Sequence, residues 1–150
     1  MKIPELNKQQ LAFIGVAAAV IGIIIVLLAV YWGKIKAHIE SNRLARAYDD
    51  EIRKTDLTLS ELQAKGIADK LFVAMDGPGT DTQALYSAFQ QIQTYSDLML
   101  VMKQFGTQKG TYDWFGGAQS LIEWIADDCS KREIEKINAI LAGKGINYVF

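Results

Sequence analysis

The chain has 150 residues, of which 50% are hydrophobic and 22% are charged, and its formal net charge at pH 7 is −1. A charge so close to zero argues against a nucleic-acid-binding protein, because such proteins usually present a basic surface. The sequence has one cysteine, Cys129, and one histidine, His38, which excludes an internal disulfide, a cysteine-rich zinc site and a histidine-dependent catalytic triad in the residues after His38. We therefore expect no cofactor and no enzymatic activity.

Residues 11–33, which follow a short head of residues 1–10, are predicted to form a transmembrane helix. Residues 11–32 read LAFIGVAAAVIGIIIVLLAVYW and contain no charged side chain. As a helix they would extend over about 33 Å, which matches a bilayer core of about 30 Å. Tyr31, Trp32 and Lys34 close this stretch and are expected to anchor it at the headgroup level.

An apolar stretch can also belong to a helix buried in a soluble core or to a cleaved signal peptide. A helix buried in a soluble core would be interrupted by polar residues at this length, and none is present. A cleaved signal peptide has an apolar region of about 7–15 residues and a small-x-small site close behind it. The nearest such site here is Ala45-Arg46-Ala47, too far from the stretch, so we expect an uncleaved anchor.

The basic residues that flank the stretch predict its orientation. Lys2 and Lys8 precede it, whereas four basic residues follow it: Lys34, Lys36, Arg43 and Arg46. Cytoplasmic flanks carry the larger number of lysines and arginines. The domain after the stretch is therefore expected on the cytoplasmic side.

A neck of residues 34–56 is predicted to continue the helix. Its apolar residues recur at helical spacing, at Ile35, Ile39, Tyr48 and Ile52. This apolar face could pack on the following domain, on a partner helix or on the bilayer surface. His38 is expected to be a solvated neck residue.

Residues 57–150 are predicted to form a compact domain of five short helices, which makes the chain all-α. Hydroxyl residues followed three positions later by an acid or amide predict helix starts at Thr58, Thr80, Thr94 and Ser130, and a fourth helix in chain order contains Trp124. The first of these helices is expected to bury Leu62, Ile67, Leu71, Ala74 and Met75.

Two further segments carry aromatic residues. A glycine-rich loop holds Tyr112, Trp114 and Phe115, which either close the bottom of a small core or contact a partner. The apolar tail after Gly145 holds Tyr148 and Phe150 and is expected to dock as an extended strap. These five aromatic residues are the predicted contacts with a protein partner.

The segment AMDGPGTD, residues 74–81, resembles the turn between the first two helices of an annexin repeat. The helix count and the run Asp127-Asp128-Cys129-Ser130 before the last helix are similar to that family too. The resemblance covers roughly residues 60–142 and implies a calcium site. In such a site Gly77 and Gly79 would supply backbone oxygens, and Asp128, Asp127 or Glu123 would supply the carboxylate, with Asp128 as the first choice.

Single-repeat domains with such a turn, similar to this one, are found in small proteins of Bacteroidota and their phages. This likeness implies a minor structural protein of a virion with an internal membrane. Such a protein would link the bilayer to capsid or vertex proteins, and a cellular membrane adaptor would show the same features. Small residues spaced four apart, Gly15 with Ala19 and Ala18 with Gly22, also favour a homo-oligomer.

Two other functions are compatible with the sequence. One is a calcium- or lipid-responsive binding module, as the annexin resemblance implies. The other is a hydrolase that acts through two carboxylates, Glu123 and Asp127, which are spaced to share one helix face. Of the three, we expect the structural membrane protein.

Overall fold

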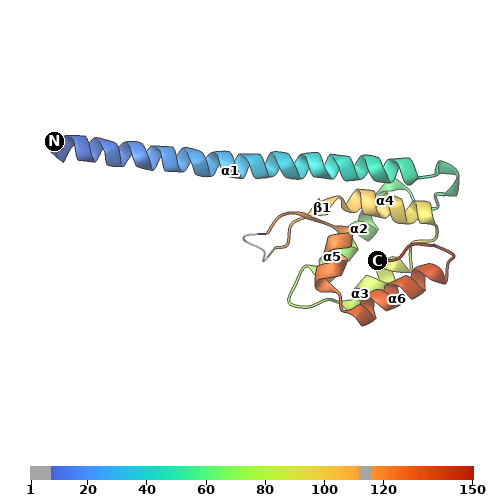
Figure 1. Ribbon diagram of the computed structural model, residues 1–150. Coiled ribbons are helices and arrows are strands. Elements are labelled where there is room, and N and C mark those ends of the chain that lie inside the picture. Colours follow the sequence, from blue (N-terminus) through green and yellow to red (C-terminus); the bar gives the residue numbers. More distant parts are fainter. Residues whose placement is uncertain (1–7, 112–115) are drawn as a thin grey trace. The chain divides into compact units, whose positions relative to one another are not determined.

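The computed structural model describes residues 8–111 and 116–150 and shows an all-α protein (Figure 1). The chain divides into two compact units, Met1–His38 and Ile39–Phe150, and the boundary falls within the first helix. The described elements are α1 (Lys8–Glu51), a 3-10 turn η1 (Lys54–Asp56), α2 (Glu61–Met75), α3 (Thr82–Phe89), α4 (Tyr95–Phe105), β1 (Thr107–Gln108), β2 (Gln119–Ser120), α5 (Leu121–Asp128) and α6 (Lys131–Ala142).

The first unit contains the apolar part of α1. Within the described residues, one helix is long and apolar enough to cross a membrane, and its most apolar window has a mean hydropathy of 2.0. None of that window is buried inside the chain. The aliphatic side chains from Val20 to Val30 are exposed, as are Tyr31 and Trp32. A helix with this surface is compatible with a membrane span, because its exposed aliphatic side chains would be stabilised by an apolar environment.

The second unit begins with the end of α1. Tyr48 is buried in the hydrophobic core of this unit, and Leu44 and Ile52 pack against the same core. Lys103 of α4 forms an ion pair with Asp49 at 2.6 Å. Leu44, Tyr48 and Ile52 of the neck therefore pack on the domain, whereas Ile39 of the same predicted face is 62% exposed.

The core of the second unit centres on α2 and α4, which pack on each other; α3 and α5 pack on α2, and α6 packs on α3. The ring of Phe72 on α2 makes edge contacts with Phe105 at 6.4 Å and with Trp124 at 5.4 Å between centroids. The indole Nε1 of Trp124 donates to the carbonyl of Gln108, at 3.2 Å. Among the described residues, the five helices α2–α6 and the end of α1 thus share one core, close to the five-helix domain that the sequence predicts.

Two predicted helix starts are confirmed and two are displaced. Thr94 and Ser130 begin α4 and α6 through capping boxes with Asp97 and Glu133. The start of α2 lies at Ser60 rather than at the predicted Thr58, whose hydroxyl and N–H both donate to Asp97.

At the second displaced start, Asp81 caps α3 in place of the predicted Thr80. The carboxylate of Asp81 accepts the N–H of Ala84 at 3.0 Å, while Thr80 donates its hydroxyl proton to the carbonyl of Asp128. Contacts with distant residues therefore move both starts, because each threonine finds its partner outside its own helix.

The sequence predicts the C-terminus of α4 but not the short β-ribbon that follows it. Gly106 ends α4 with φ of 58°, a left-handed conformation that favours glycine, as expected for this position. The antiparallel pairing of β1 with β2 is not anticipated by the sequence, because each strand has only two residues. The pairing aligns Thr107 with Ser120, so the glycine-rich loop leaves and re-enters the domain at one place.

Asp97 is a fully buried carboxylate that holds the entries to α2 and α4 together. Its Oδ1 accepts the N–H groups of Thr58 and Leu59 at 2.8 and 3.0 Å, and its Oδ2 accepts the hydroxyl of Thr58 at 2.6 Å. The N–H groups of Gln93 and Thr94 donate to Oδ2 at 3.3 and 3.2 Å. Burial acts to raise the pKa of Asp97, but these hydrogen bonds outweigh it and hold the pKa below its ordinary value.

We expect Asp97→Asn to lower the free energy of unfolding by about 2–4 kcal/mol, because an amide nitrogen in place of Oδ1 or Oδ2 would face N–H donors. Urea unfolding of the full chain in mild detergent measures the change. Asp50→Asn, at an exposed position of α1, is the matched control and should stay within about 0.5 kcal/mol of the parent. An equal loss in both variants would contradict the role given to Asp97.

The lowered pKa of Asp97 also predicts how stability depends on pH. The contribution of this carboxylate is complete above the pKa of an unfolded aspartate, about 3.9, and is lost as the pH falls through the lower pKa of the folded state. Melting temperatures measured from neutral pH downward should therefore fall at acid pH. The fall should be smaller in Asp97→Asn, and identical slopes in both proteins would refute the assignment.

Candidate functional site

The glycine turn lies against the end of α5. Gly79 has a φ of 99°, which only glycine adopts without strain, and the N–H of Asp81 closes the turn on the carbonyl of Ala74 at 2.8 Å. The hydroxyl of Thr80 donates to the carbonyl of Asp128 at 2.9 Å, across 48 positions of sequence. The structure thus brings the turn that contains Gly77 and Gly79 beside Asp128, the three residues named for a calcium site.

Acidic side chains gather at this place. Partial burial raises the pKa of Asp128, and the nearby charges of Asp127 and Asp76 raise it further. The carboxylate of Asp76 accepts the N–H of Thr111 at 2.8 Å and also its hydroxyl. In residues 8–111 and 116–150, no three histidine, cysteine or acidic side chains are grouped so that they could hold a metal ion. Calcium bound here would therefore depend on backbone carbonyls for most of its coordination.

The carboxylate pair considered for hydrolysis is engaged in local structure. Glu123 accepts the N–H and the hydroxyl of Ser120, both at 2.7 Å, and these two bonds lower its pKa. Asp127 accepts from Nε2 of Gln119 at 2.5 Å. A general acid needs a raised pKa near neutral pH, so the environment of Glu123 favours a helix cap over acid catalysis.

The apolar tail packs on the domain that carries it. The side chain of Asn138 on α6 accepts the N–H of Phe150 at 3.0 Å and donates to its carbonyl at 3.3 Å. The ring of Phe150 contacts Phe89 at 5.6 Å and Tyr148 at 4.9 Å between centroids. Both tail aromatics are half-buried, so any partner would meet only their outer edges. The loop aromatics Tyr112, Trp114 and Phe115 lie outside the described residues.

The outward face of α2 is the surface that the sequence does not predict correctly. Leu62, expected in the core, is 83% exposed, and Val73 is 72% exposed. Leu62 lies on the side of the helix opposite Leu71, because nine residues turn an α-helix through two and a half turns. An open groove of about 430 Å³ borders this face, with Val73, Ala74 and Ala84 among its lining residues.

Comparison with protein-family models, with curated proteins and with solved structures finds no match to this chain. The annexin resemblance and the likeness to small proteins of Bacteroidota and their phages therefore stay predictions that rest on the residues quoted for them. The structure itself defines the class: an all-α protein that has, in its described residues, one helix long and apolar enough to cross a membrane and a compact unit of small helices.

Proposed function

We propose that this chain is a non-enzymatic, single-pass membrane protein that links a bilayer to a protein layer through its helical domain. The observation that carries the proposal is α1, which is long and apolar enough to cross a membrane and whose side chains from Val20 to Trp32 are exposed. Tyr31 and Trp32 at its end are exposed too, and Lys34 follows them, the order expected at a headgroup boundary.

Three acidic side chains of the domain are engaged in helix caps, which supports a structural role for them. Asp97, Glu123 and Glu133 each accept hydrogen bonds from the residue that begins a helix, and the pKa of each is lowered. Carboxylates held in this way stabilise the helices and stay charged near neutral pH. The domain then offers its outer surfaces for contacts with other proteins.

The orientation and the setting are part of the same proposal. The excess of basic residues after the stretch supports a cytoplasmic domain. A capsid that assembles on the cytoplasmic side of a membrane would meet the domain there, so a phage virion with an internal membrane is a setting that suits the chain. A cellular membrane adaptor is the alternative setting.

We expect the full chain to remain in the membrane after extraction with alkaline carbonate. Replacing Ile24 and Leu27 with lysine should release it, because each lysine at the centre of a span costs about 3 kcal/mol. The matched control is lysine at Ile122 and Val149, both exposed in the domain, which should leave the chain in the membrane. Release of the parent chain by carbonate would contradict the proposed membrane anchor. So would an intact-protein mass that shows the N-terminal residues to have been removed.

Purification from the native source in mild detergent, followed by mass spectrometry, tests the partner. Capsid or vertex proteins that co-purify would support the virion setting. Cellular membrane or cytoplasmic proteins would support the adaptor instead. Recovery of the chain without another protein would contradict a linking role.

The alternative of a calcium-responsive module is favoured by one observation, the position of Asp128 beside the glycine turn and near two other acids. If calcium binds there, it should raise the melting temperature of the full chain, because a ligand that binds only the folded state stabilises it. Asp128→Ala should then abolish the rise, whereas Asp50→Ala should not. A melting temperature that calcium leaves unchanged in the parent chain would exclude this function.

A further inference from the structure

The outward face of α2 carries an apolar stripe with a gap at its centre. Leu62, Gly66 and Val73 fall within about 40° of one another around the helix, at 100° per residue. Leu62 and Val73 are exposed, and a Cβ placed on Gly66 would meet no atom within 4 Å. The opposite face of the same helix carries Ile67 and Leu71 and is buried in the core.

We propose that α2 pairs with α2 of a second copy of this chain, antiparallel, when both copies are anchored in one membrane. The pairing rests on the proposed membrane function, because anchoring in one membrane supplies the local concentration of chains that the pairing needs. It is separate from self-association through the small residues of the apolar stretch, because it uses a face of the helical domain.

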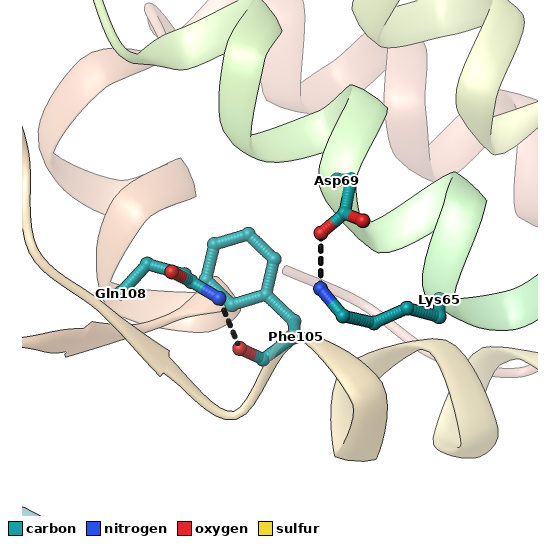
Figure 2. A network of polar contacts seen from close by, with 4 residues as sticks. All are labelled: Lys65, Asp69, Phe105 and Gln108. Carbon is teal, nitrogen blue, oxygen red and sulfur yellow. Dashed lines mark hydrogen bonds and ion pairs between the residues drawn. The ribbon is translucent and has the colours of Figure 1, made fainter.

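The charges at the edge of this face are complementary to those of a second copy of the chain, which indicates that a second copy binds there. Lys65 and Asp69 lie one turn apart at the edge of the apolar stripe and form an ion pair within the chain (Figure 2). In an antiparallel pair related by a two-fold axis, residues on one edge of the first helix face the same edge of the second. The register that places Lys65 opposite Asp69 of the second copy also places Asp69 opposite its Lys65, so both charges find opposite partners.

The same register matches the apolar residues. It brings Leu62 of one copy within about 1.5 Å, along the axis, of the level of Val73 in the other. Gly66 then lies close to the two-fold axis, where the absence of a side chain lets the helices approach closely. One register therefore satisfies the ion pairs, the Leu62–Val73 contacts and the close approach together.

The size of the face explains why the membrane is needed. Four apolar side chains, two from each copy, bury far less than the roughly 1,200 Å² of a stable interface between freely diffusing proteins. Anchoring two copies in one bilayer raises their effective concentration, which lets a weak contact form. The contact is therefore expected between anchored chains.

Disulfide trapping in the full chain, reconstituted in phosphatidylcholine vesicles, tests the register. Each variant carries Cys129→Ala, and either Leu62→Cys or Val73→Cys is added. Oxidation of the two variants mixed should give about tenfold more covalent dimer than either variant by itself. The reason is that Leu62 and its own copy would lie about 15 Å apart along the axis, too far for a disulfide.

A cysteine at Ile122, exposed on α5, is the matched control and should give no more dimer with Leu62→Cys than the single variants do. Equal trapping in single and mixed samples, or no trapping in any, would overturn the proposal. Flotation of the same vesicles separates this failure from failure of the proposed function. Chains that float without trapping refute the pairing, whereas chains that do not float refute the anchor and with it the setting of the pairing.

Charge exchange supplies a second test that needs no cysteine. Lys65→Asp leaves two negative charges on the face and Asp69→Lys leaves two positive charges, so each variant should repel its own copies. Energy transfer between fluorophores on vesicle-bound chains should fall to background for each variant and return when the two are mixed. Failure of the mixture to recover the signal would overturn the pairing, because the intrachain ion pair is absent from both variants in every sample.

Discussion

The carboxylate of Asp97 is the interaction on which the helical unit depends. It accepts five hydrogen bonds from two segments that precede it in the chain, residues 58–59 before α2 and residues 93–94 before α4. A buried charge is costly unless it is fully paired, and here four backbone N–H groups and one hydroxyl donate to the carboxylate. The Asp97 carboxylate therefore pairs the polar groups of the segments that lead into α2 and α4, the two helices at the centre of the core. These bonds hold the starts of the two helices together.

Polar groups elsewhere in the helical unit are also paired by hydrogen bonds, with fewer bonds to each group than Asp97 accepts. Glu123 and Glu133 cap their helices, Thr80 joins the glycine turn to α5, and Lys144 donates to the carbonyls of Gln90 and Ile92 at the end of α3. These contacts maintain the fold, and the proposed linking role would depend on the outer faces of the helices. A membrane-anchored binding protein fits such a distribution, because its function would lie in surface contacts.

The sequence predicts helices well where the signal is local and less well where distant residues compete. The capping boxes at Thr94 and Ser130 form as predicted, because donor and acceptor lie three residues apart. Thr58 and Thr80 have the same local pattern, yet each donates to a distant residue, so the helix start moves. The candidate calcium residues are suggested by the sequence only through a resemblance. In the structure, the hydrogen bond from Thr80 to the carbonyl of Asp128 places Asp128 beside the glycine turn.

By itself the sequence determines the apolar stretch of α1, the all-α class and the five helices that follow. Each of these depends on composition, on a period of 3.6 residues or on a cap within one turn, all of which act along the chain. Only the tertiary structure decides that Tyr48 joins the core, that Asp97 joins two helix entries and that Leu62 faces outward. Those outcomes depend on which helix faces which, and burial is a free energy of the whole packed unit that no single segment contains.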